Sequence, residues 1–198
     1  MTTTQWRHDR GPSTVVEPVA RYATTAILIH WSVVVLILVA FPLGLYMHGL
    51  ALTPDKLRLY SYHKWIGVTV FVITLARLAF RALHAPPGLP SSMSVWERRA
   101  AQAAHGLLYA FLFLVPVSGW LMSSAMGFQT VWFGLIPLPD LIAKSKSLAA
   151  MLWQLHQVLN FLMLCLILLH TAAALRHHFL QRDETLKRML PWLRRGWR

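Results

Sequence analysis

Five of the ten histidines in this 198-residue chain lie within long apolar stretches rather than in polar segments. An ionisable side chain inside a membrane helix is costly, and such a residue usually faces the interior of a helix bundle, where it has a function. Neutral imidazole is a common metal ligand, and imidazole also exchanges protons near neutral pH. Metal binding or proton transfer is therefore indicated at five positions, which are His30, His63, His105, His156 and His170.

The spacing of two of these residues shows how they lie on a helix. His156 and His170 are 14 residues apart, which is about 21 Å at the helical rise of 1.5 Å per residue. At about 100° per residue, 14 residues come within about 40° of four full turns. The two imidazoles therefore point in the same direction from opposite ends of one helix.

The elements that must hold these histidines are four apolar runs of membrane-spanning length. Hydrophobic residues make up 56% of the chain and charged residues only 13%, with a mean hydropathy of +0.48, whereas soluble domains carry about 25% charge. This composition excludes a soluble domain and a disordered chain, and the single cysteine excludes a disulfide scaffold. A spanning helix needs about 20 apolar residues, and the runs cover approximately 26–46, 60–83, 100–126 and 148–175.

We expect an all-α membrane protein with a bundle of four transmembrane helices. No run alternates apolar and polar residues as a membrane barrel would, and helices are the remaining way to satisfy backbone groups in lipid. Pro42 and Pro116 lie within runs and predict kinks rather than helix ends. Ser94 and Glu97 fit a capping box that begins the third helix before its apolar part.

The distribution of Lys and Arg predicts the orientation. Fourteen of the 19 lie in the two tails and around the connection between the second and third runs, against five on the opposite side. Because basic residues collect in cytoplasmic segments, both termini should be cytoplasmic. The same rule accounts for the net charge of +12 without nucleic acid as a partner. The expected organisation is a tail at 1–22, a membrane domain at 23–178 and a basic tail at 179–198.

This topology sorts the histidines into two layers. His30, His105 and His170 lie near the inner ends of helices, and His63 and His156 lie near the outer ends. Imidazoles at two depths suit a bundle enclosing two haems, because haem iron accepts an imidazole on each axial side. Zinc is less suited, since neither layer has further Cys or carboxylate ligands. A proton relay is expected to use intramembrane Asp or Glu, and the runs contain none.

Several details stay open at this stage. The residues alone do not decide which two of the three inner histidines pair. His48 lies near the outer surface, 18 residues after His30, and competes with His63 as an outer ligand. Gly67 lies one turn deeper than His63, and Gly119 lies at the outer depth of the third run. The absence of a side chain at either glycine could let a flat macrocycle approach, and ordinary small-residue helix packing is the alternative.

Short motifs in the chain resemble those of the bacterial cytochrome b561 family. The resemblance extends over about 21–191. The motifs are ILIHW at 27–31, HKWIG at 63–67, RLAFR at 77–81, WQLH at 153–156, HTAAALRHH at 170–178 and LKRMLP at 186–191.

The resemblance implies a four-helix protein of the bacterial inner membrane that holds two haem b groups. It implies that His30 and His170 ligate the inner haem and that His63 and His156 ligate the outer one. In one branch of the family, superoxide is oxidised at the periplasmic face and ubiquinone is reduced near the cytoplasmic haem. The resemblance implies the same oxidoreductase activity here.

Basic residues flank the outer layer. Lys56, Arg58 and Lys64 surround His63 in the sequence, and such a cluster raises the local concentration of a small anion such as superoxide by electrostatic focusing. We therefore take these three residues as candidate catalytic residues. The alternative is that they form only a solvated helix end.

Three polar residues near the inner layer are further candidates for cofactor binding. Arg77 and Arg81 are four residues apart on one helix face, where they could pair with haem propionates or extend to the membrane surface. His177, seven residues after His170, could hydrogen-bond a quinone carbonyl and supply a proton. The alternative for His177 is a basic flank that contacts anionic lipid.

A second function class fits the same features. The chain could be an electron-transfer cytochrome b subunit whose donor or acceptor is another protein, such as a dehydrogenase or hydrogenase. Reduction of the haems by superoxide without a partner would distinguish the self-contained enzyme from such a subunit.

Overall fold

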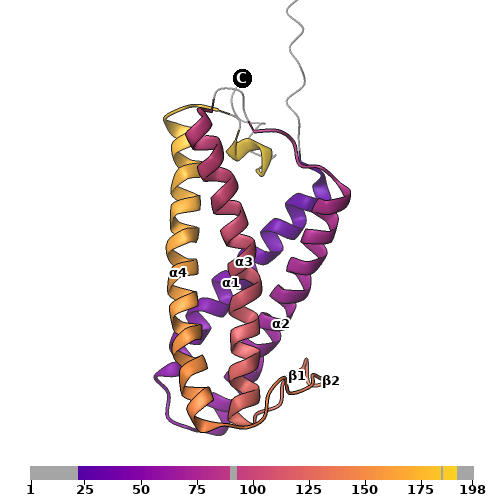
Figure 1. Ribbon diagram of the computed structural model, residues 1–198, viewed down its shortest axis with the longest axis vertical. Helices are drawn as coiled ribbons and strands as arrows, with labels where there is room; N and C mark the ends of the chain where they lie inside the picture. Colours follow the sequence, from indigo (N-terminus) through magenta and orange to yellow (C-terminus); the bar gives the residue numbers. More distant parts are fainter. Residues whose placement is uncertain (1–21, 90–92, 184, 191–198) are drawn as a thin grey trace, which may run out of the picture.

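The computed structural model describes residues 22–89, 93–183 and 185–190, so most of the predicted N-terminal tail and part of the C-terminal tail lie outside the described residues. The chain forms a bundle of long helices (Figure 1), which are α1 (Thr24–His48), α2 (Pro54–Leu83), α3 (Val95–Met126) and α4 (Lys146–Phe179). All four are long and apolar enough to cross a membrane. The predicted four-helix membrane bundle is thus confirmed.

Polar capping residues begin three of the helices outside the apolar runs. The Thr53 side chain accepts a hydrogen bond from the backbone N–H of Lys56 at the start of α2. Ser94 and Glu97 form the predicted capping box before α3, and Ser145 caps α4. Such caps satisfy backbone donors that the helix itself leaves free. Each of these three helices therefore begins before the apolar run that predicted it.

The two intrahelical prolines do not end their helices. Pro42 lies inside α1 and Pro116 inside α3, as predicted. By contrast, Gly127 ends α3 with φ of 77°, a left-handed conformation that glycine adopts without steric cost.

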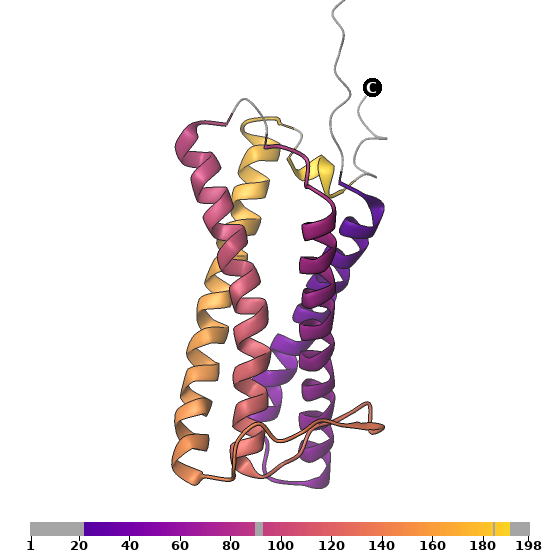
Figure 2. The ribbon, with the colours of Figure 1, turned by 45° about the vertical axis from the view of Figure 1, so that its right-hand side comes forward.

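The helices pack as neighbours in the order α1, α2, α3 and α4, with the most extensive contacts between α3 and α4 and between α1 and α2. Figures 1 and 2 show the start of α1, the end of α2, the start of α3 and the end of α4 at one end of the bundle. We call this the inner end, following the predicted orientation, and the opposite end the outer end. The inner and outer histidine layers therefore lie toward opposite ends.

Packing between helices is concentrated in two small clusters. Val33, Val70 and Leu112 join α1, α2 and α3, and a second cluster of Ala125, Ala149 and Leu152 joins α3 to α4. Many large apolar side chains face outward instead, such as Leu38 and Leu168 at 67% and 61% exposure. Exposed apolar side chains on spanning helices are suited to contact with lipid.

The connection between α3 and α4 contains a hairpin that the sequence analysis did not predict. Strands β1 (Val131–Trp132) and β2 (Ile136–Pro137) pair antiparallel. Three indole N–H groups anchor this connection. The bonds run from Trp65 to the Val131 carbonyl (2.6 Å), from Trp132 to the Thr69 hydroxyl (3.2 Å) and from Trp120 to the Pro139 carbonyl (3.1 Å).

A short segment after α4 contacts the other helices at the inner end. It includes the 3-10 helix η1 (Leu186–Arg188). The Trp31 indole of α1 donates to the Met189 carbonyl at 2.9 Å, and the Arg188 guanidinium donates to the Gly88 carbonyl at 2.6 Å. The segment therefore links the beginning of α1, the residues after α2 and the end of α4.

Candidate functional site

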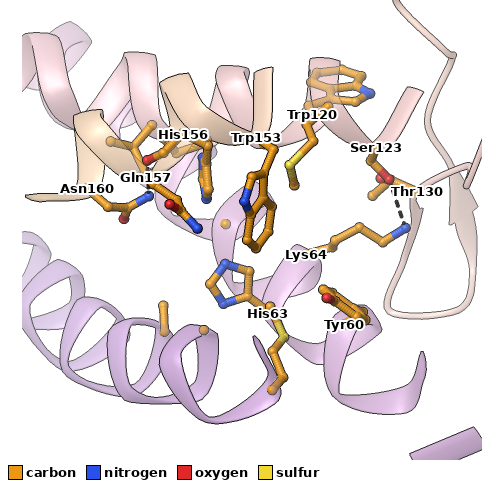
Figure 3. A pocket seen from close by; sticks show the side chains of 18 of the residues that line it. Tyr60, His63, Lys64, Trp120, Ser123, Thr130, Trp153, His156, Gln157 and Asn160 are labelled. Carbon is orange, nitrogen blue, oxygen red and sulfur yellow. Dashed lines mark hydrogen bonds between the residues drawn. The ribbon is translucent and has the colours of Figure 1, made fainter. Parts of the chain in front are cut away.

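Two of the five membrane histidines face each other toward the outer end. His63 of α2 and His156 of α4 have ring centroids 6.5 Å apart and ring planes inclined by 85°, and both line one space between the helices (Figure 3). A metal ion bonded to one nitrogen of each ring fits this separation, since imidazole–metal bonds are about 2 Å long. The structure thus brings together the two residues of the outer layer.

Glycines lie against both imidazoles. A Cβ atom at Gly44 of α1 would lie 3.1 Å from Cε1 of His63, and a Cβ atom at Gly119 of α3 would lie 3.1 Å from Cε1 of His156. Any larger residue would crowd the ring. Gly119 therefore makes room for the imidazole itself, a role that differs from both the macrocycle clearance and the small-residue helix packing considered from the sequence.

Gly44 was not identified from the sequence, although a signal for it was present. It lies 14 residues after His30, and Gly119 likewise lies 14 residues after His105. A residue 14 positions further along a helix returns to nearly the same face at the opposite depth. In both helices, the glycine on the histidine face meets the outer histidine of the following helix.

A serine fixes the protonation of one imidazole. The Ser118 hydroxyl donates to the Val115 carbonyl at 2.8 Å and lies 2.9 Å from Nδ1 of His156. Because a hydroxyl has one hydrogen, the oxygen must accept from Nδ1–H of His156. Nε2 of His156 then carries the lone pair, which is the form in which imidazole binds a metal. Ser118 was not identified from the sequence.

The space between the facing imidazoles is a cavity of about 1230 Å³, above the roughly 300–1,000 Å³ of most ligand pockets. Gly67 lies in its wall, with no atom within 4 Å of the place that a Cβ would occupy. The size of the cavity and the open space beside Gly67 fit a large flat group with a metal at its centre.

Lys64 lies on the outer side of this cavity. Its ammonium donates to the Ser123 hydroxyl at 3.2 Å and to the carbonyls of Phe128 and Gln129 at 3.3 and 3.2 Å. These acceptors engage all three of its hydrogens. The Trp153 indole lines the same cavity (Figure 3). Lys64 therefore contributes a positive charge held at a fixed place beside the cavity.

The other two predicted basic residues lie differently. Lys56 lines the cavity, and its ammonium donates to the Leu50 carbonyl at 2.5 Å. Arg58 is not among the residues that line this cavity. Its nearest acidic group is Asp55 at 3.9 Å, and the two side chains are 67% and 84% exposed. The structure thus places Lys56 and Lys64 together at the cavity and Arg58 in solvent.

His48, the other candidate for an outer ligand, lies in the wall of the same cavity. Its ring lies 5.1 Å from the ring of Trp153, and both residues line the cavity. His63, not His48, is the imidazole that faces His156.

The inner layer contains three imidazoles. His105 of α3 and His170 of α4 have ring centroids 5.4 Å apart. His30 of α1 lies within electrostatic range of both residues and of Arg77. Nδ1 of His30 is buried without a hydrogen-bond partner among the described residues. The structure therefore groups His30, His105 and His170 but does not reduce them to a pair.

Arg77 and Arg81 lie beside this inner group. Their guanidinium carbons are 5.2 and 5.8 Å from the centre of the Tyr109 ring, within the range of a cation–π contact. Neither arginine forms an ion pair with an acidic residue in the described part of the chain. Two positive charges without a carboxylate near buried imidazoles are suited to the carboxylates of a cofactor.

His177 is buried at the inner end, with 8% exposure. Its Nδ1 lies 2.7 Å from Oδ2 of Asp183. Asp183 was not identified from the sequence, because the contact depends on how the chain turns back after α4. His177 therefore has an acidic hydrogen-bond partner. A histidine whose only role was to contact anionic lipid would not need this partner.

Spanning helices with imidazoles facing across the bundle define a membrane cytochrome. The family model for prokaryotic cytochrome b561 matches residues 21–192, and the chain belongs to this family. It is 34% identical over 171 residues to cytochrome b561 homolog 2 of Escherichia coli K12, covering 86% of this chain and 91% of that protein. It is 27% identical to the probable superoxide oxidase CybB of Yersinia pestis, covering 86% and 96%.

Membership of this family makes the chain a multi-pass membrane protein of electron transfer and implies that it binds haem b. The resemblance found in the sequence motifs is therefore confirmed.

Proposed function

We propose that the chain oxidises superoxide at the outer face of the membrane and reduces ubiquinone at the inner face. The observation that carries this proposal is the cavity between His63 and His156, which has these two facing imidazoles and two lysines in its wall. The named relative from Yersinia pestis, a probable superoxide oxidase, supports the same activity.

Two haem b groups would supply one-electron redox chemistry at two depths when bound. His63 and His156 would hold the outer group, with Gly67 leaving room for its plane and Ser118 fixing His156 in the metal-binding form. His30 and His170 would hold the inner group, a choice that rests on the family resemblance. Arg77 and Arg81 would neutralise its carboxylates.

The fixed charges at the outer cavity favour an anionic substrate. Lys56 and Lys64 already donate to backbone oxygens, so they act by attraction over distance rather than by a direct hydrogen bond. Superoxide that reaches this region loses one electron and leaves as dioxygen. Focusing by charges beside a cavity raises the rate of encounter and is weakened by salt.

At the inner end, ubiquinone would accept two electrons and two protons. His177 lies two helical turns beyond His170 and would hydrogen-bond a quinone carbonyl. The predicted orientation, with both termini cytoplasmic, would place this step at the cytoplasmic face, where protons are taken up.

The test uses the purified full-length chain without any partner protein. We expect two haem b per chain, rapid haem reduction by superoxide, and reoxidation when ubiquinone is added. The same assay with borohydride-reduced or dithionite-reduced protein separates the second step from the first. Haem that superoxide does not reduce unless a dehydrogenase or hydrogenase is added would contradict the proposal and favour an electron-transfer subunit.

A further inference from the structure

The chain reverses direction after α4 in a way that places one carboxylate against His177. Backbone N–H groups of Leu180 and Gln181 donate to the Arg176 carbonyl, and the N–H of Asp183 donates to the His177 carbonyl at 3.1 Å. Arg182 has φ of 54°, so the turn passes through the left-handed region. Asp183 therefore returns to the side chain of His177, six residues earlier.

Both side chains of the resulting pair are largely buried. Their exposed fractions are 10% for His177 and 12% for Asp183. One carboxylate oxygen of Asp183 lies 2.7 Å from Nδ1 of His177, and the other accepts from the Thr185 backbone N–H at 2.8 Å. Burial opposes ionisation of Asp183, but the hydrogen bonds from Thr185 and His177 hold its pKa below the usual value. Asp183 is therefore an anion at neutral pH.

This contact determines which nitrogen of His177 can exchange a proton. A carboxylate only accepts hydrogen bonds, so Nδ1 must carry its hydrogen. Nε2 has no hydrogen-bond partner among the described residues. The imidazole can therefore gain or lose a proton at Nε2 while Nδ1 stays bound to Asp183.

The position of the pair relates it to the inner layer. His177 is seven residues beyond His170, about 10.5 Å further along α4 and within about 20° of the same face. The segment that carries Asp183 continues to Met189, whose carbonyl accepts from Trp31, the neighbour of His30. The pair thus lies between the inner histidines and the inner end of the bundle.

Two other charged side chains of the surrounding elements, Arg176 and Arg188, have different partners. Arg176 forms an ion pair with Glu97 of α3 at 3.2 Å, and Gln181 donates to the same carboxylate. Arg188 of η1 donates to the Gly88 carbonyl. Asp183 is the acidic side chain that contacts His177 in the described part of the chain.

We propose that Asp183 is a positioning residue for proton transfer, which holds His177 with Nδ1 protonated and presents Nε2 to the quinone. This inference rests on the proposed function. Two superoxide ions supply two electrons and become two dioxygen molecules, and the quinone takes up these electrons and two protons. One of the protons leaves Nε2 of His177 for a quinone oxygen, and Nε2 is then protonated again from the cytoplasm. The second proton comes from water at the same face.

The first test needs no substitution in the pair. The protein is labelled with ¹⁵N-histidine and measured at a pH where the His177 imidazole is neutral. Its resonances should then show hydrogen on Nδ1 and none on Nε2. The His177→Gln variant assigns these resonances. A neutral His177 with hydrogen on Nε2 overturns the proposal, whether or not the protein reduces quinone.

The second test follows reoxidation of reduced haem by ubiquinone as a function of pH. His177→Gln should slow this step about 100-fold at neutral pH, the loss expected for a missing general acid. Asp183→Asn should slow it about tenfold, because Nδ1 of His177 loses its carboxylate acceptor, while Asp183→Glu should restore the rate. Glu97→Gln, at the same end of the bundle, is the matched control and should match the wild type.

The outcomes separate this inference from the proposed function. A wild-type protein that passes no electrons to ubiquinone overturns both. A wild type that reduces ubiquinone at the same rate and with the same pH profile as Asp183→Asn overturns only the role of Asp183. Haem content of each variant, measured from its spectrum, shows that the inner haem site is intact.

Discussion

The two histidine layers differ in what surrounds the imidazoles. The outer layer has two imidazoles across an open cavity, each against a glycine of a neighbouring helix. The inner layer has three imidazoles close together, two arginines stacked on a tyrosine, and a covering segment from the C-terminal side of α4. The outer layer therefore suits access by a small substrate, while the inner layer suits a site that controls charge and protons.

The strongest test of this comparison removes one outer imidazole. His156→Ala should abolish binding of the outer haem and leave the inner haem in place, so that haem content falls from two per chain to one. The pyridine haemochrome assay measures this content, and redox titration identifies the remaining haem. Loss of neither haem would refute the outer pair.

The inner layer allows a similar experiment that distinguishes its three imidazoles. If His30 and His170 are the ligands, alanine at either position should remove the inner haem. His105→Ala should keep it, with a shift in its reduction potential because a neighbouring polar ring is lost. A protein that loses the inner haem on removal of His105 and keeps it on removal of His30 would reassign the pair.

Substitution of Gly67 should have a smaller effect than loss of a histidine, and this effect should be confined to haem binding. Because a Cβ at this position meets no atom of the protein within 4 Å, Gly67→Ala should leave the apoprotein folded but weaken haem binding in the cavity. Gly106, on α3 with equally open surroundings but an exposed position outside the cavity, provides the control. Equal haem affinity in the two alanine variants would show that the macrocycle does not pass over Gly67.

The smallest effect concerns the two lysines. The double variant Lys56→Gln and Lys64→Gln should slow haem reduction by superoxide about threefold to tenfold and flatten its dependence on ionic strength. Arg58→Gln should have a smaller effect, because Arg58 lies in solvent away from the cavity. Stopped-flow measurements at several salt concentrations test this order, and an Arg58 effect larger than that of the lysines would reverse it.

The hydropathy of the sequence predicted the helices well because lipid imposes a minimum apolar length on each span. It did not predict the helix ends, since these depend on caps such as Thr53 and Ser145 rather than on hydropathy. The hairpin at Val131–Trp132 and Ile136–Pro137 was missed because long-range bonds from tryptophans hold it.

Some residues of the candidate site could be predicted from the sequence, and others could not because their contacts depend on the tertiary structure. The predicted topology of the four runs placed His63 and His156 at one depth without knowledge of the tertiary structure. Helical periodicity contained the signal for Gly44, as the spacing from His30 shows. Asp183 could not be found in this way, because its contact with His177 depends on a turn through Arg182 in the left-handed region.

The contacts of His63 with Gly44 of α1 and of His156 with Gly119 of α3 bear on how the protein assembles in the membrane. Each outer histidine is held by the helix that precedes its own, so the first and second helices form one antiparallel hairpin unit and the third and fourth form another. Each proposed ligand pair takes one imidazole from each unit. The two units also contact each other directly, through Val33, Val70 and Leu112, so chains cut within 84–93 should reassociate more tightly when haem is supplied than without it.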